Sequence, residues 1–281
     1  MEWSLEFGSF PPPPKFRSTL LHIILGGTNV LDDFTLIAAR YENLDYLNIY
    51  PLGDVHIGSN EFDQELFNKW VDMVKNDPNG AVVIIGDMMN MGLKNSKTNI
   101  YEEALNPMQQ KELCYELLKP IADKIIAGCS GNHEYRATKE VGTNPLYDVF
   151  CRLGIEDRYR ENACFIKLQV GKVGKNPNVY GVVLTHGRSK TKDAQWNYAV
   201  DGCDCFISGH THLGTHQPCG KIRMDLSHNI VKTVGYQHIV VLPFLRYGGY
   251  AISGKYMPTQ IGQFQCISFD GKSKRVGYTY F

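Results

Sequence analysis

The chain has 281 residues with 29 basic and 29 acidic side chains, so its formal net charge is zero. A neutral chain of this length can bury a sizeable core, and its charge provides no overall attraction to nucleic acid or to an anionic membrane. Its eight cysteines are too sparse for a disulfide scaffold, and none has the C-x-x-C spacing of a structural zinc site.

The first forty residues do not predict a packed element. The run PPPP at 11–14 is typical of an extended segment. The apolar run LLHIILGG lies too late and is too short for a secretory signal, and no apolar run reaches the roughly 20 residues that span a bilayer. We therefore expect a soluble, cytoplasmic protein that does not contact a membrane. Residues 1–40 would form an N-terminal extension of unknown role, and residues 41–281 a single domain.

Strands and helices alternate in the first half of this domain. Apolar runs predict the strands, and apolar residues at helical spacing predict the helices. In chain order we expect a strand at 44–52, a helix at 61–76 capped by Asn60, a strand at 81–85, a helix at 107–123, and a strand at 124–129 that leads into a polar turn.

The second half is rich in strands. A helix at 145–154, closed by Gly154, is followed by runs that predict strands, and the last two of these runs alternate as half-exposed antiparallel strands do. These runs lie at 163–171, 178–185, 203–208, 232–244 and 262–281. An α/β first half and a β-rich second half predict an α/β layered fold of two packed mixed β-sheets flanked by helices.

Polar side chains and a glycine follow five of the expected strands. The five segments are Gly53-Asp54-Val55-His56, Gly86-Asp87, Gly131-Asn132-His133-Glu134, Thr185-His186-Gly187 and Gly209-His210-Thr211-His212. Each segment by itself is also typical of a structural turn, a helix cap or a core histidine. His210 and His212, two positions apart in an extended segment, would point to the same side. Five such ends in succession, carrying Asp, Asn or His, indicate a metal site.

In this order, GDVH, GDMMN, GNHE, THG and GHTH resemble the calcineurin-like metallophosphoesterase superfamily, including members found in bacteria and their phages. The resemblance covers about residues 46–216. It implies a four-layer sandwich, in which helices flank two mixed sheets, and a two-metal centre on loops at strand ends. It also implies phosphate ester hydrolysis by a hydroxide that bridges the two metal ions.

The resemblance further implies two sets of ligands that share one carboxylate. Asp54, His56 and His212 would bind the first ion, Asn132, His186 and His210 the second, and Asp87 both. Imidazole and carboxylate ligands suit Mn, Fe, Zn or Ni, and we expect two Mn²⁺ ions. With Asp87 and Asn132, His133 would complete the catalytic residues by protonating the leaving oxygen or holding phosphate. The alternative for His133 is an ordinary loop histidine.

Two positions depart from the phosphoprotein phosphatases of this superfamily, which carry an acid and then an arginine where this chain has Asn90 and Met91. The amide of Asn90 can accept a hydrogen bond from His133, but it brings no charge to favour the imidazolium. We therefore expect a phosphodiesterase that acts on nucleic acid or a nucleotide, in other words a nuclease-like activity. The alternatives are a phosphomonoesterase or protein phosphatase, and a non-catalytic scaffold on the same fold.

Two arginines are candidates for contact with substrate phosphate, Arg136 and Arg188, and both also suit solvated loops. The segment GRSKTKDAQW, with the aromatic residues of PFLRYGGY at 243–250, would give a nucleotide both charge and a stacking surface. Aromatic residues at strand spacing are more often part of a core. The oligomeric state is not predicted.

Overall fold

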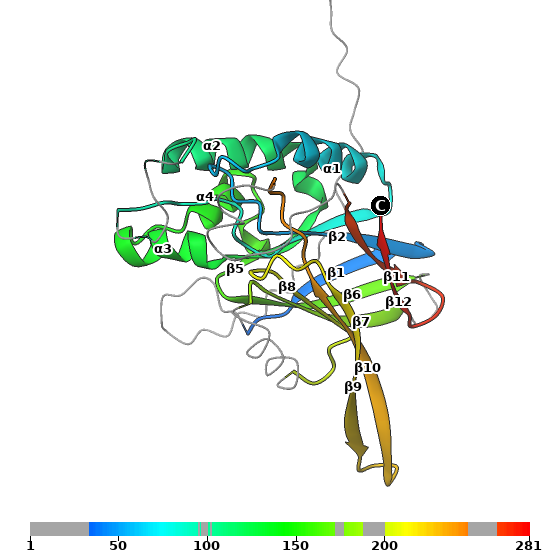
Figure 1. The fold of residues 1–281 in the computed structure, drawn as a ribbon. Coiled ribbons are helices and arrows are strands. Elements are labelled where there is room, and N and C mark those ends of the chain that lie inside the picture. The colour runs from blue at the N-terminus through cyan, green and yellow to red at the C-terminus, as the bar shows by residue number, and fades with distance from the viewer. Residues whose placement is uncertain are drawn as a thin grey trace, which may run out of the picture.

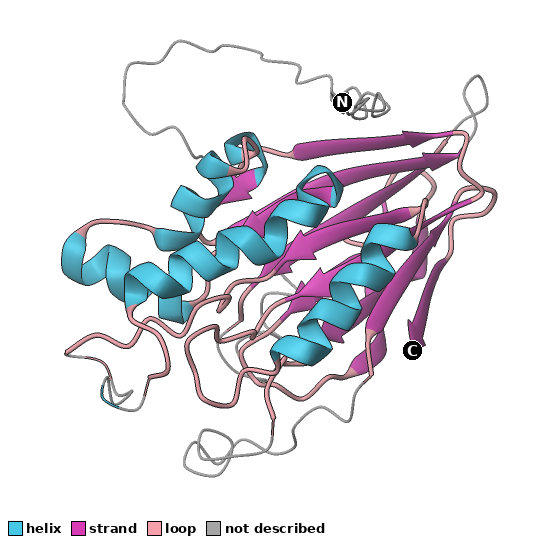
Figure 2. Cartoon of the chain, turned by 90° about the horizontal axis from the view of Figure 1, so that it is seen from above, coloured by secondary structure: helices cyan, strands magenta, loops and turns pink. Residues whose placement is uncertain are grey.

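Two six-stranded mixed β-sheets pack face to face in the computed structural model, which describes residues 34–94, 96, 101, 103–171, 177–187, 200–246 and 263–281. A buried cluster drawn from both sheets fills the space between them. Helices cover the outer face of one sheet (Figure 1), and the view from above shows them side by side over its strands (Figure 2). The predicted architecture of two mixed sheets with flanking helices is confirmed.

The helix-covered sheet has the strand order β12-β11-β2-β3-β4-β5. Its strands are β2 (Tyr46–Leu52), β3 (Gly80–Ile84), β4 (Ile125–Cys129), β5 (Tyr159–Arg160), β11 (Gln265–Asp270) and β12 (Val276–Tyr280). In β3, Ala81 and Val83 face the other sheet, whereas Val82 and Ile84 face the helices. Burial on both faces explains why this strand is a continuous apolar run.

The second sheet has the order β1-β6-β7-β8-β10-β9. Its strands are β1 (Ile37–Glu42), β6 (Ala163–Gly171), β7 (Asn178–Thr185), β8 (Cys205–Ser208), β9 (His216–Asp225) and β10 (Ile230–Val240). β1 pairs with β6 in parallel, so residues 37–40, which we assigned to the N-terminal extension, form part of this sheet. Residues 1–33 lie outside the described part of the chain. The β9–β10 hairpin extends away from the body of the protein (Figure 1).

The helices are α1 (Gln64–Asn76), α2 (Pro107–Leu118), α3 (Asn132–Val141) and α4 (Pro145–Arg152), with short 3₁₀ helices η2 (Lys119–Lys124) and η3 (Glu156–Arg158). α1 begins later than predicted, and its cap is Asp63, which accepts a hydrogen bond from the Leu66 N–H, and not Asn60. The helix expected at 107–123 changes to a 3₁₀ helix after Leu118, where Pro120 has no N–H to donate. No helix in the described part of the chain is long and apolar enough to cross a membrane.

α3 stands where the sequence predicted only a polar turn. Its buried residues are His133, Glu134 and Ala137, so the side of the helix that faces the protein is mostly polar. The apolar periodicity that identifies a helix is therefore absent from its sequence. The position of α3 matters for function, because the helix begins at Asn132 and carries His133.

Candidate metal centre

The five polar strand ends converge because parallel strands place their carboxyl ends at the same edge of a sheet. β2, β3 and β4 are parallel neighbours, and they end just before the segments that contain Asp54, Asp87 and Asn132. β7 and β8 are parallel neighbours in the other sheet, and they lead to His186 and His210. The two sheets thus deliver their polar residues to one place.

Five of the predicted ligands have a left-handed backbone. Their φ angles are 50° at Asp54, 51° at His56, 49° at Asp87, 69° at His210 and 56° at His212. Such angles are uncommon outside glycine and tend to cluster at functional sites. The loops are also tied together, since the Val55 and His56 N–H groups both donate to the Asp87 carbonyl, at 2.9 and 3.0 Å.

A glycine permits the closest approach between two of these loops. A Cβ at Gly131 would overlap the Asp87 carboxylate, so any other residue at position 131 would displace that carboxylate. Instead the backbone approaches closely, and the His133 N–H donates to Asp87 Oδ1 at 2.8 Å. The glycine before Asn132 therefore sets the distance between α3 and the Asp87 loop.

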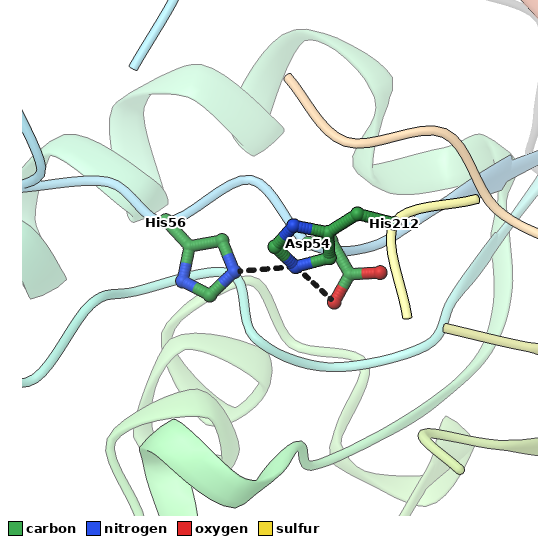
Figure 3. Close-up of side chains that lie close together, drawn as sticks. All are labelled: Asp54, His56 and His212. Carbon is green, nitrogen blue, oxygen red and sulfur yellow. Dashed lines mark hydrogen bonds and ion pairs between the residues drawn. The ribbon is translucent and has the colours of Figure 1, made fainter. Parts of the chain in front are cut away.

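The first group of ligand atoms comes from Asp54, His56 and His212 (Figure 3). The two histidine Nε2 atoms lie 3.3 Å apart, and His212 Nε2 lies 3.6 Å from Asp54 Oδ1. All three side chains are buried. The Asp54 carboxylate also accepts a hydrogen bond from the His210 N–H, at 2.9 Å to Oδ2, which fixes its orientation.

The second group comes from Asp87, His186 and His210. His186 Nε2 lies 3.0 Å from Asp87 Oδ2, and its Nδ1 lies 2.9 Å from the Ile85 carbonyl. The carbonyl holds a proton on Nδ1, which leaves Nε2 as the atom available to a metal. Asn132 Oδ1 lies 3.0 Å from His186 Nε2 and 2.8 Å from His210 Nδ1, so the amide lies against both histidines of this group.

Buried charges favour a cation at this place. Burial raises the pKa of Asp54, although the His212 imidazole opposes the shift. Burial would also raise the pKa of Asp87, but the imidazoles of His133 and His186 hold it well below its usual range. Burial opposes a positive charge on His186, yet the Asp87 carboxylate raises its pKa to about 10. A site that stabilises positive charge beside two buried carboxylates is suited to divalent cations.

The donor set fits a transition metal. Within each group, imidazole nitrogens and carboxylate oxygens lie within 4.8 Å of one another, and no thiolate takes part. Divalent first-row metals such as Mn, Fe, Zn and Ni accept this mixture of nitrogen and oxygen ligands.

The family model for calcineurin-like phosphoesterases matches residues 47–214. This span covers more than half of the chain, from β2 to the loop after β8, and it contains every predicted ligand. The chain belongs to the calcineurin-like phosphoesterase family. Family membership and the clustered His and Asp side chains together support a metal-dependent phosphoesterase, with a phosphate ester as its substrate.

Two solved structures were also found to be similar. The calcineurin-like phosphoesterase YfkN from Bacillus subtilis is 12% identical, with a TM-score of 0.39, over 84% of this chain and 90% of that chain. Vps29 from Entamoeba histolytica, solved in complex with Zn²⁺, is 11% identical, with a TM-score of 0.35, over 84% of this chain and 98% of that chain. A comparison with curated proteins found no match.

His133 of this phosphoesterase is held between a carbonyl and an arginine. Its Nδ1 lies 2.7 Å from the Asn90 carbonyl, and its Nε2 lies 3.1 Å from Arg136 Nη2. Because a guanidinium only donates, Nε2 accepts and the ring proton lies on Nδ1. Burial lowers the pKa of His133 to about 4, which agrees with a neutral ring. We expected the Asn90 side chain to accept a hydrogen bond from His133, but the acceptor is the Asn90 backbone carbonyl.

Glu134 is a residue of the site that sequence analysis missed. Its buried carboxylate accepts hydrogen bonds from three backbone N–H groups, those of Asp87 at 2.9 Å, Met89 at 3.0 Å and Gly131 at 2.9 Å. It thereby joins the Asp87 loop to the start of α3. A signal for it existed, since Glu134 stands at the third position of α3, where a glutamate often accepts from the N-cap N–H.

The structure places only some of the residues that we expected to contact substrate. Arg136 lies in the site through its contact with His133. Arg188 and the rest of GRSKTKDAQW lie outside the described residues. The expectation that Phe244 would provide a stacking surface for a base is wrong. Phe244 is 3% exposed and packs edge-on against Phe67 and Trp70 of α1, at ring distances of 5.2 and 5.8 Å.

Proposed function

We propose that the protein is a binuclear metal-dependent phosphoesterase that hydrolyses phosphodiesters, with nucleic acid or nucleotides as its substrate class. The observation that carries the proposal is the position of Asp87. Its Oδ2 lies 3.0 Å from His186 Nε2 in one group and 4.0 Å from His56 Nε2 in the other. One carboxylate oxygen therefore faces both groups of ligand atoms.

The contacts support the proposed ligands. Asp54, His56 and His212 would hold one ion, Asn132, His186 and His210 would hold the other, and Asp87 would contribute to both. Two Mn²⁺ ions bound there would supply an activated water and neutralise the phosphoryl oxygens. The protein contributes the orientation of each ligand, through the Ile85 carbonyl on His186 and the His210 N–H on Asp54.

The proposed role of His133 is to protonate the leaving oxygen or to hold the phosphate. Its Nδ1 is occupied by the Asn90 carbonyl, so Nε2 is the atom that faces the reacting group. Nε2 lies 3.7 Å from Asp87 Oδ2, which places it beside the proposed ions. To donate to the leaving oxygen, Nε2 must first acquire a proton, and Arg136 must move from Nε2 to a phosphate oxygen.

The preference for diesters is supported by the charge around His133. Met91 takes the place of an arginine in phosphoprotein phosphatases, and its side chain is apolar and buried. Arg136 contributes a cationic side chain in contact with His133. A monoester carries up to two negative charges at neutral pH and a diester carries one, so a site with less cationic neutralisation suits the diester.

Hydrolysis of bis-p-nitrophenyl phosphate and p-nitrophenyl phosphate tests this proposal. The full chain would be stripped of metal, reconstituted with Mn²⁺ and assayed with both compounds. We expect metal-dependent turnover that is faster on the diester. Asp87→Ala should abolish it, because both groups of ligands lose their common carboxylate.

The matched control is Asp72→Ala, which removes an exposed carboxylate from α1 and should leave turnover unchanged. Turnover of the monoester alone would replace the proposal by a phosphomonoesterase. Bound Mn²⁺ without turnover of either ester, or of DNA, RNA and cyclic nucleotides, would favour a scaffold.

A further inference from the structure

Glu103 lies outside the family motifs, in the segment before α2, yet its carboxylate reaches the loop that orients His133. Asn90 Nδ2 donates to Glu103 Oε1 at 3.1 Å. Gln110 Nε2 donates to the other oxygen, Oε2. The Gly92 N–H is a third donor to this carboxylate. Glu103 thus receives hydrogen bonds from both ends of the Asn90–Gly92 loop.

Gln110 holds the middle of the same loop. It is fully buried on α2, and its Oε1 accepts from the Met91 N–H at 2.8 Å. Its Nε2 donates to Glu103 and also to the Leu105 carbonyl, at 2.8 Å. Glu103 and Gln110 therefore act as a pair that fixes all three residues of the loop.

The packing around Glu103 leaves space for its carboxylate and little else. A Cβ at Gly92 would overlap the Glu103 carboxylate, so the glycine provides the space that the carboxylate occupies. Met91 has a left-handed backbone, with φ of 45°, a strained conformation for a methionine. The hydrogen bond from the Met91 N–H to Gln110 supports that conformation.

The geometry of this loop determines where the Asn90 carbonyl lies relative to the His133 ring. The Asn90 carbonyl lies 2.7 Å from His133 Nδ1, so the backbone of the loop orients that ring. The side chain of Asn90 donates to Glu103 through Nδ2. A carboxylate thus stands behind position 90, where phosphoprotein phosphatases have an acid, but it is delivered by a different segment of the chain.

We propose that Glu103 is a positioning residue for His133, acting through Asn90 and the Asn90–Gly92 loop. The proposal rests on the proposed function for the role of His133 in hydrolysis. It does not depend on that function for the orientation of the His133 ring. Glu103 holds the loop, the loop presents the Asn90 carbonyl, and the carbonyl keeps the proton on Nδ1 so that Nε2 faces the substrate.

The ring orientation can be tested without activity, by NMR of the full chain reconstituted with diamagnetic Zn²⁺. A His133 Nδ1–H bonded to a buried carbonyl gives a slowly exchanging signal, assigned by its absence from His133→Ala. We expect the signal in the wild type and its loss in Glu103→Ala. Glu112→Ala is the matched control, because it removes a glutamate that binds Arg152 between α2 and α4 and should keep the signal.

Two further variants keep the test informative if Glu103→Ala does not fold. Glu103→Gln keeps one acceptor oxygen, so the signal should weaken rather than disappear. Gly92→Ala leaves Glu103 in the chain but places a Cβ where its carboxylate lies, and should have the same effect as Glu103→Ala. A His133 signal that is unchanged in all folded Glu103 and Gly92 variants would overturn the proposal.

The kinetic test compares two diesters that differ in their leaving group. A good leaving group such as p-nitrophenolate needs little protonation, whereas the alkoxide of a dinucleotide needs it. General acid catalysis contributes about 10²–10⁴-fold, and displacing the acid should forfeit about 10-fold to 100-fold of kcat on the dinucleotide. On bis-p-nitrophenyl phosphate we expect about twofold or less, with KM unchanged for both.

The double variant Glu103→Ala/His133→Ala separates positioning from a general loss of structure. If Glu103 acts through His133, the double variant should be no slower on the dinucleotide than His133→Ala. If Glu103→Ala lowers kcat equally on both diesters, Glu103 does not act through leaving-group protonation. If the losses of kcat in the two single variants add in the double variant, Glu103 does not act through His133. A wild type without turnover would refute the proposed function and leave the NMR result to decide the role of Glu103.

Discussion

At the scale of single residues, the metal centre combines strained backbones with tightly held side chains. Asp54, His56 and Asp87 all adopt left-handed backbone angles. Each such residue costs about 1–3 kcal/mol and persists only where the surrounding structure over-determines its conformation. Hydrogen bonds between the loops provide that support, such as those from the Val55 and His56 N–H groups to the Asp87 carbonyl.

His133 is the residue whose role most needs separation from its neighbours, since its ring also lies close enough to His56 and Asp87 to act as a ligand. Its Nε2 contacts the Arg136 guanidinium, a cation that disfavours a metal ion on the same atom. We predict that His133→Ala keeps its full content of bound metal and loses about 10²-fold or more of kcat on a dinucleotide. In contrast, His186→Ala should lose one ion. Metal analysis of both purified variants checks this, and a lost ion in His133→Ala would make it a ligand.

At the scale of elements, the start of α3 organises the site. Glu134 collects the N–H groups of Asp87, Met89 and Gly131, so one carboxylate connects the end of β3 with the end of β4. Its pKa is raised by burial and by the charge of Asp87. The element that sequence periodicity missed is therefore the one that joins two strand-end loops.

Glu134→Gln should destabilise the protein, because an amide NH₂ would face an N–H group that the carboxylate now accepts from. Leaving a buried donor unsatisfied costs about 1–3 kcal/mol of unfolding free energy. Chemical denaturation of the metal-free protein measures this loss. Glu140→Gln, on the exposed side of the same helix, should change it by less than about 0.5 kcal/mol. Equal stability of the two variants would show that Glu134 does not hold the loops together.

At the scale of the whole molecule, the sequence was most informative about features that depend on local pattern. The strands at β2, β3 and β4 and the polar residues after them were predictable, because an apolar run that ends in glycine has a clear local signature. The grouping of Asp54 with His212 required the resemblance to a family, since it depends on how two sheets pack.

What escaped sequence analysis depends on contacts between distant segments. Phe244 becomes core because it meets Phe67 and Trp70 of α1. Glu103 reaches Asn90 only in the folded chain. Strand spacing favoured a core position for Phe244 without naming its partners, whereas nothing in the spacing indicated the contact between Glu103 and Asn90.

The proposed function depends on two metal ions that share the Asp87 carboxylate in one site. Electron paramagnetic resonance during titration of the metal-free full chain with Mn²⁺ tests it most directly. We predict two bound ions per chain and, at full loading, the spectrum of a magnetically coupled pair, which Asp87→Ala should lose. A spectrum of isolated Mn²⁺ ions at full loading, or saturation at one ion per chain, would rule out a binuclear centre that shares Asp87.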